Sequence, residues 1–370
     1  MIYASTLVAA ATLAVSAQAR SIDLNKYNFA SFVKEYKHSW QGDELVKRQA
    51  IFESELARVK DHNAANKSWK ESINKFSAMT KSEKKINQGY NKHSAVSHES
   101  KYEEPFDLKL LPISELPTDV DWRKHEPNVV TSVKDQGHCG SCWAFATAAV
   151  LESQVALKSG LLFDFSPQQI AMCSPNPDNC GGSGGCYGAT SEIAFDYLVE
   201  SGIMEEYVMG YNAYFGDNAA CGVTSEMIPK ATITGFTHLP TNNYTALMNS
   251  VAQVGPISIS VDADTFHSYE SGIFDGCNQE QPNINHAVTL VGYGEEQGEK
   301  YWLVRNSWSA SFGEAGYIRV KRTDDDDEVC GMDTTPHDGD ACDGEDDPIK
   351  ACGTCGILFG SSYALGVDLA

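Results

Sequence analysis

Lysine and arginine are scarce in this 370-residue chain: 28 of them stand against 50 aspartates and glutamates, giving a formal net charge of −22. This excess of negative charge repels phosphate backbones and anionic lipid headgroups, which argues against nucleic acid or a membrane surface as a partner. The deficit is uneven. Residues 1–111 carry 17 Lys+Arg and 13 Asp+Glu, net +4, whereas residues 112–370 carry 11 and 37, net −26. The chain therefore joins two segments of opposite charge.

Long apolar runs are lacking as well. The run at residues 7–15 is too short to cross a bilayer, and no other run is long enough. Ala17-Gln18-Ala19 follows it as a small-residue cleavage pattern, although no Lys or Arg precedes the run. We interpret residues 1–19 as a signal peptide, the alternative being a buried N-terminal helix. The sequence thus predicts the secretory pathway, with a lysosome, a vacuole or the extracellular medium as the destination, and no membrane span.

Cysteine is absent from the first 138 residues, and all eleven cysteines lie at or after Cys139. In a secreted or lumenal chain, disulfides are the default state of cysteine. Because eleven is odd, we expect one thiol to remain outside the bridges.

Residues from about 21 to 90 are free of cysteine, rich in lysine and helical in pattern. Leu45, Phe52, Leu56 and Val59 recur at helical intervals, which predicts an amphipathic helix of several turns. A polar stretch at residues 91–105 follows and reads as a linker.

From about residue 116 the pattern changes. Residues 142–160 and 191–202 read as helices, and after about residue 230 strand patterns dominate, notably 255–263, 286–294, 301–308 and 316–322. We therefore predict an α+β domain over residues 116–370, with a helical half at about 116–228 and a β half at about 229–370. Ligand clefts tend to lie at such a seam.

The acidic segment at residues 324–347 does not fit either pattern. We interpret it as a solvated insertion anchored by disulfides. A calcium site is the alternative because carboxylates suit that ion, but the spacing of an EF-hand loop is absent. We predict no metal and no other cofactor.

Cys139 and Cys142 form a CxxC in "QGHCGSCWAF". Such a pair can be a thiol–disulfide couple, half of a zinc site, or a bridged cysteine beside a reactive one. Cys142 begins the helix at 142–160, and a helix N-terminus favours the thiolate. A thiolate nucleophile also needs a base and a group that orients the base.

Hairpin geometry selects His286 from the six histidines after residue 116. The strands at 286–294 and 301–308 are joined by a polar turn, so paired residue numbers sum to about 593. His286 therefore faces roughly Ser307, with Asn306 beside it. An amide oxygen there can accept a hydrogen bond from one imidazole nitrogen and direct the other toward Cys142.

Three motifs together, "QGHCGSCWAF", "NHAVTLVGYG" and "RNSWSASFGEAGYIRV", resemble the papain-like cysteine proteases of the cathepsin L type. The resemblance extends from about residue 28 to the C-terminus. Glu44, Arg48, Phe52 and Asn63 match the spacing of that family's ERFNIN inhibitory helix, whereas Glu55 replaces its first Asn.

The resemblance implies a papain-like two-domain fold, with a helical left domain, a β-barrel-like right domain and a helical inhibitory prosegment at residues 20–115. It implies an endopeptidase that is made as a zymogen, is inhibited by its own propeptide and acts on proteins and peptides as a monomer. Cys142 would be the nucleophile, His286 the acid and base, and Asn306 its orienting group. Trp308 would shield their hydrogen bond, and Gln136 would contribute to the oxyanion hole.

The resemblance also implies the disulfides Cys139–Cys186, Cys173–Cys221 and Cys277–Cys355. It pairs none of the four remaining cysteines, which are Cys180, Cys330, Cys342 and Cys352. A bridge Cys330–Cys342 across the acidic segment is our guess.

Substrate-binding residues follow from the resemblance too. Gly188 and Ala189 would bind substrate backbone at the cleft rim. The pocket for the second residue upstream of the cut would be lined by Ser191, Ser260, Ile284 and Gly360. Its small, uncharged floor favours Leu or Phe and not Arg.

Several residues depart from the family pattern. Ser309 stands at a glycine position and Phe312 at a tryptophan position on the leaving-group side. Ser72 and Ala78 replace the Gly and Asp of the prosegment's G-x-N-x-F-x-D pattern, and that Asp is linked in the family to acid-triggered release. The net charges of the two segments offer another trigger, because acid weakens their attraction.

Three other functions remain open at this point. An exopeptidase would block the cleft with an added segment, but the insertion at residues 174–185 is short and has no paired histidines. A disulfide oxidoreductase would use a CxxC in a small βαβ domain, which the pattern does not show. A catalytically inactive papain-like binding protein is the third.

Asn66 and Asn243 lie in sequence triplets that have the form of N-glycosylation acceptors.

Overall fold

The computed structural model describes residues 22–89, 100–336, 342 and 347–370. The predicted signal peptide and most of residues 337–346 of the acidic segment lie outside the described residues. None of the helices in the described ranges is long and apolar enough to span a membrane.

Residues 22–89, called here the N-terminal segment, form a small unit with its own core. Phe32, Phe52, Val59, Ile73 and Ala78 are buried together in it. The segment contains α1 (Phe29–Glu35), α2 (Gly42–Ala64), β1 (Trp69–Glu71) and α3 (Lys81–Ile86). The predicted amphipathic helix is therefore present as α2.

Helix α4 (Cys142–Ser159) is the centre of the helical half. It is buried along almost its whole length because its many alanines let other elements pack closely on every side. It ends at Gly160, whose left-handed conformation (φ 73°) suits a residue without Cβ. Two further helices pack on it, α5 (Pro167–Cys173) and α6 (Ser191–Ser201).

The β half is built on a nine-stranded sheet with the path β1-β6-β9-β8-β7-β5-β12-β4, and β2 pairs with β7. The strands are β2 (Val120–Asp121), β4 (Gly235–His238), β5 (Ile257–Val261), β6 (Tyr269–Phe274), β7 (His286–Glu296), β8 (Glu299–Arg305), β9 (Tyr317–Arg322) and β12 (Ser361–Leu365). Helix α7 (Tyr244–Gln253) packs against this half, and the short pairs are β3 (Ala231–Thr232) with β13 (Asp368–Leu369) and β10 (Cys330–Asp333) with β11 (Ile349–Cys352). The predicted α+β class with a helical and a β half is confirmed.

The β7–β8 hairpin has the predicted strands but a slightly different register. Thr289 pairs with Arg305, and beyond a bulge Gly292 pairs with Leu303. Paired numbers therefore sum to 594 or 595 instead of 593, because a bulge adds one residue to a strand. His286 and Asn306 still lie at the same end of the hairpin.

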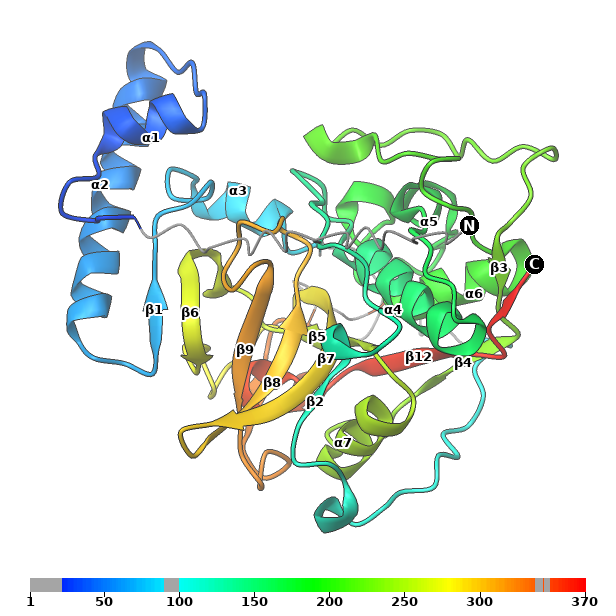
Figure 1. Cartoon of the computed structure of the whole chain (residues 1–370). Helices are drawn as coiled ribbons and strands as arrows, with labels where there is room; N and C mark the ends of the chain where they lie inside the picture. The colour runs from blue at the N-terminus through cyan, green and yellow to red at the C-terminus, as the bar shows by residue number, and fades with distance from the viewer. Residues whose placement is uncertain (1–21, 90–99, 337–341, 343–346) are drawn as a thin grey trace, which may run out of the picture.

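The N-terminal segment lies along one edge of the sheet (Figure 1). Strand β1 pairs antiparallel with β6, with Trp69 opposite Gly272. In Figure 1, α1 and α2 stand outside this edge, and α3 passes above the sheet toward the helical half. The segment therefore extends the sheet and then crosses toward the seam between the two halves.

Candidate active site

Cys142 is the first residue of α4 and is completely buried. All eleven cysteines lie within the described residues; ten form five disulfides and Cys142 keeps its thiol. Its sulfur lies 3.5 Å from the backbone nitrogen of Ala287, the residue after His286. The start of α4 and the start of β7 therefore meet at this sulfur.

His286 and Asn306 are joined by a hydrogen bond. The Nε2 atom of His286 is 2.9 Å from Oδ1 of Asn306, which also accepts the Ser307 backbone N–H. The Trp308 ring lies 4.8 Å from the His286 ring and is itself fully buried. Burial lowers the pKa of His286 to about 4, although hydrogen bonds with the Asn306 side chain and the Gln88 backbone act to raise it.

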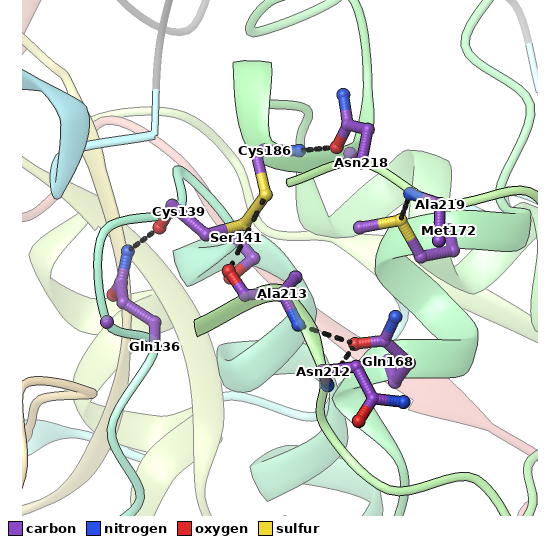
Figure 2. The surroundings of a disulfide bond; sticks show 12 residues. Gln136, Cys139, Ser141, Gln168, Met172, Cys186, Asn212, Ala213, Asn218 and Ala219 are labelled. Carbon is purple, nitrogen blue, oxygen red and sulfur yellow. Dashed lines mark hydrogen bonds between the residues drawn. A yellow bond between two sulfur atoms is a disulfide. The ribbon is translucent and has the colours of Figure 1, made fainter. Parts of the chain in front are cut away.

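Gln136 is held from both ends of its amide. Its Oε1 accepts a hydrogen bond from the Ser307 hydroxyl at 2.6 Å, and its Nε2 donates to the Cys139 carbonyl at 2.8 Å. Figure 2 shows this amide directed at the Cys139 carbonyl, beside the disulfide Cys139–Cys186. The bridge holds the loop before α4, and the donor nitrogen is fixed at the Cys139 carbonyl of this loop.

Backbone of the N-terminal segment fills the space between these groups. The Asn87 carbonyl accepts hydrogen bonds from Gln136 Nε2 at 3.0 Å and from Trp308 Nε1 at 3.2 Å. The Cys142 thiol donates to the Gln88 carbonyl at 3.3 Å. This segment therefore runs directly over the sulfur.

Gly89 continues this path without a side chain. A Cβ there would lie 2.4 Å from the Cys142 sulfur, and the residue has φ +84°. The Gly89 carbonyl also packs on Gly188, where a Cβ would come within 1.6 Å of its oxygen. The chain thus enters on the Trp308 side of Cys142 and leaves on the Gly188 side.

Some of the predicted substrate-binding residues lie near this path. Gly188 touches Gly89, and Ala189 follows it and is buried. The Ser260 N–H donates to the Gly360 carbonyl at 2.8 Å. The Ser191 hydroxyl instead pairs with that of Ser258. Buried Ile284 packs near Gly356, so the described contacts do not join all four predicted pocket residues.

The structure contains the disulfides Cys139–Cys186, Cys173–Cys221 and Cys277–Cys355 implied by the resemblance. Our guess of Cys330–Cys342 is wrong. Cys330 is bridged to Cys352 because the two face each other across β10 and β11, and Cys342 is bridged to Cys180.

Comparisons with known proteins agree with this geometry. The family model described as papain family cysteine protease matches residues 116–339, and the cathepsin propeptide inhibitor domain matches residues 29–84. The chain belongs to the papain family of cysteine proteases. It is a cysteine endopeptidase of the cathepsin L type, made as a zymogen, and the N-terminal segment is called the propeptide below.

Individual relatives cover most of the protease chain. Procathepsin L of Mus musculus is 37% identical over 299 residues, which is 78% of this chain and 84% of that protein. A KDEL-tailed cysteine endopeptidase of Arabidopsis thaliana is 35% identical over 81% of this chain and 85% of its own length. Digestive procathepsin L 3 of Tenebrio molitor superposes with a TM-score of 0.70 at 30% identity, covering 91% of this chain and 97% of that chain.

His267 is a member of the site that sequence reasoning did not single out. Its ring stacks on Trp308 at 4.6 Å, and Phe76 of the propeptide covers it edge-on at 4.9 Å. Burial, aided by the charges of Lys84 and His286, lowers the pKa of His267 to about 3. Trp308 therefore lies between two buried imidazoles in the zymogen.

The family departures are absorbed locally. Phe312, at the tryptophan position, is buried edge-on against Trp308 with ring centroids 5.3 Å apart. Ser309 adopts φ +75°, a conformation that glycine takes without strain, and its hydroxyl pairs with that of Ser311. Ala78 is buried in the propeptide core, and its carbonyl accepts a hydrogen bond from Arg48.

We expect Gly89→Ala to weaken inhibition by the propeptide. The added methyl group would overlap the Cys142 sulfur in a left-handed conformation, so the backbone must move away. The intact zymogen should then hydrolyse a fluorogenic peptide roughly tenfold faster or more than the parent at pH 7. Gly42→Ala is the matched control, because Gly42 is also left-handed (φ +54°) but has no atom within 4 Å of the new methyl group. A Gly89→Ala zymogen that hydrolyses the peptide no faster than the parent zymogen would contradict the prediction.

The lowered pKa of His267 predicts that acid weakens propeptide binding. The bound state favours the neutral ring, so affinity is complete above pH 6.5 and is lost as pH falls from 6.5 toward 3. At pH 4.5 this one group weakens binding by up to about a hundredfold, since pH 4.5 lies two units below the unperturbed pKa.

His267→Phe keeps an aromatic ring but removes the titration. In a Cys142→Ser background, a trace of active enzyme should process this variant with less acceleration between pH 6.5 and 4.5 than the parent, measured as mature chain on gels. His125→Gln, at a partly exposed histidine that contacts Pro127, should behave as the parent does. An unchanged acceleration in His267→Phe would rule this residue out.

Proposed function

We propose that Cys142 is the nucleophile of this endopeptidase and His286 its acid and base. The observation that carries the proposal is the meeting of three elements at one sulfur. The His286–Asn306 pair lies at 2.9 Å, and the Ala287 nitrogen lies 3.5 Å from the Cys142 sulfur. On the other side, the Gln136 amide already binds a peptide carbonyl, that of Asn87.

The first half of the reaction forms an acyl-enzyme. The Cys142 thiolate attacks the carbonyl carbon, and the oxyanion accepts hydrogen bonds from Gln136 Nε2 and the Cys142 backbone N–H. The His286 imidazolium gives its proton to the departing amine, so the C–N bond breaks and a thioester remains. The loss of one oxyanion donor typically costs about a hundredfold or more in rate.

The second half regenerates the thiolate. Neutral His286 takes a proton from water, the hydroxide adds to the thioester carbonyl, and the C–S bond breaks to release the acid product. Asn306 fixes the ring orientation throughout, and Trp308 keeps water from the His286–Asn306 hydrogen bond.

The bound propeptide is not cleaved at this position because the site's groups act on different peptide units. Gln136 binds the carbonyl of Asn87, whereas the sulfur faces the carbonyl oxygen of Gln88. The donor and the nucleophile thus do not converge on one carbonyl group. This explains how the propeptide occupies the cleft and inhibits the enzyme without being cleaved.

We infer the following organisation from the sequence and these contacts: a signal peptide at residues 1–19, a propeptide at 20–115 and the peptidase domain at 116–370. Ten disulfide-bonded cysteines support folding in an oxidising compartment. The proposed destination is a lysosome, a vacuole or the extracellular medium, and the proposed active form is a monomer.

Substitution of the proposed catalytic residues is expected to separate their roles. Cys142→Ser should abolish peptide hydrolysis and labelling by an epoxysuccinyl thiol-protease inhibitor. His286→Asn should lower kcat by several orders of magnitude, and Asn306→Ala by roughly tenfold or more because the ring loses its orientation. The enzyme is processed in trans; active-site titration then measures inhibitor labelling, and peptide kinetics measure kcat. His125→Asn serves as the control. A Cys142→Ser enzyme that still hydrolyses the peptide would overturn the assignment of Cys142 as the nucleophile.

The pocket for the second upstream residue is expected to select uncharged side chains. Gly360 contributes no side chain, and the predicted neighbours Ser191 and Ser260 carry no charge. A buried arginine without a carboxylate partner is costly. The mature enzyme should therefore hydrolyse a Phe-Arg peptide at least tenfold faster than an Arg-Arg peptide, compared as kcat/KM. Equal values would contradict this view of the pocket.

A further inference from the structure

Asp135 lies on the leaving-group side of the cleft, next to the proposed oxyanion donor. It precedes Gln136, and its backbone forms an isolated antiparallel bridge with Trp308. The neighbouring Ser309 N–H donates to the Lys134 carbonyl. Gly188, which we expect to bind the substrate backbone before the cut, lies on the opposite side of Cys142. Asp135 therefore faces the part of a substrate that follows the cut.

In the zymogen, Asp135 holds a lysine of the propeptide with both carboxylate oxygens. The Lys75 Nζ atom lies 2.8 Å from Oδ1 and 2.7 Å from Oδ2, and both side chains are about three-quarters buried. The Gly137 backbone N–H also donates to Oδ1, and the Tyr214 hydroxyl lies 3.5 Å from Oδ2. The carboxylate is therefore held in place by the enzyme and not by the propeptide alone.

Removal of the propeptide leaves this carboxylate without its cation. Lys75 is the one lysine or arginine that pairs with Asp135 within the described ranges. Tyr214, which is partly exposed, stays beside the carboxylate and gives the space next to it an aromatic wall. What remains is a carboxylate with a fixed orientation, open to the leaving-group side of the cleft.

We propose that Asp135 makes the mature enzyme favour substrates with lysine or arginine within the three residues that follow the cut. The proposal rests on the proposed function of Cys142 and His286. The propeptide lysine is the template for the interaction, because it shows that the carboxylate accepts an ammonium group with both oxygens. The negative charge of residues 112–370 further favours a basic partner at this rim.

The test uses wild-type enzyme activated from the full-length zymogen. Internally quenched peptides share one sequence with Phe-Arg before the cut, and differ only by Gln or Lys at the first, second or third residue after it. The Lys-to-Gln ratio of kcat/KM should reach roughly three- to tenfold at one or two positions. It should fall toward one in 0.5 M NaCl, because a partly exposed ion pair is screened by salt.

Asp135→Asn should bring the ratio close to one, since the amide keeps the shape and the Gly137 hydrogen bond but loses the charge. Glu299→Gln is the matched control: it removes one exposed charge at the β7–β8 turn and should keep the wild-type ratio. A ratio near one in the wild type, or a full ratio in Asp135→Asn, would overturn the proposal. Each ratio compares two substrates of one enzyme, so partial misfolding of a variant does not affect it.

A binding measurement separates this proposal from the proposed catalytic function. The same peptides, labelled with a fluorophore, are titrated with mature Cys142→Ser enzyme prepared by processing in trans. If the Gln peptides are not hydrolysed by the wild type, the catalytic assignment fails. The Lys-to-Gln ratio of dissociation constants then still decides the role of Asp135, with tighter binding of the Lys peptides supporting it and equal binding overturning it.

Discussion

The structure depends on the burial of one sulfur between three unrelated pieces of chain. Cys142 lies at the start of α4, against the backbone after His286, and beneath the propeptide backbone at Gln88 and Gly89. The position that the proposed mechanism requires of the Cys142 thiol also makes the thiol easy to cover, because a peptide backbone is the expected occupant of this space. In the mechanism we propose, catalysis and inhibition therefore use the same contacts, and they differ in which carbonyl reaches Gln136.

Features that depend on short-range patterns could be predicted from the sequence. The spacing of Phe52 and Val59 predicted α2, and the strands flanking a polar turn predicted that His286 and Asn306 share one end of a hairpin. The bridge Cys180–Cys342 could not be predicted, because it joins positions 162 residues apart. The ion pair of Lys75 with Asp135 could not be predicted from the sequence for the same reason. Each residue alone is an ordinary surface charge, and only the docking of the propeptide brings the two together.

The opposite net charges of the two segments act alongside specific contacts between the propeptide and the peptidase domain. Lys101 and Glu200 form an ion pair, but both are well exposed, and such pairs contribute little. The specific contacts are the partly buried Lys75–Asp135 ion pair, the β1–β6 strand pairing, the Asn87 carbonyl on Gln136, and Phe76 packed on Trp308 and His267. Long-range attraction thus guides and supports a propeptide whose position is set by backbone hydrogen bonds and aromatic packing.

We therefore expect acid to act on the zymogen largely through the enzyme side of this interface. The propeptide has Ala78 where the family carries an aspartate, and the Arg48 guanidinium lowers the pKa of Glu83 to about 2, so that carboxylate stays charged in mild acid. Burial lowers the pKa of both His267 and His286, and the propeptide contacts both, through Phe76 and the Gln88 backbone respectively. Both histidines belong to the peptidase domain. Protonation of either one therefore places a positive charge on the surface that the propeptide covers. The loss of a titrating group from the propeptide core is therefore compatible with release in acid.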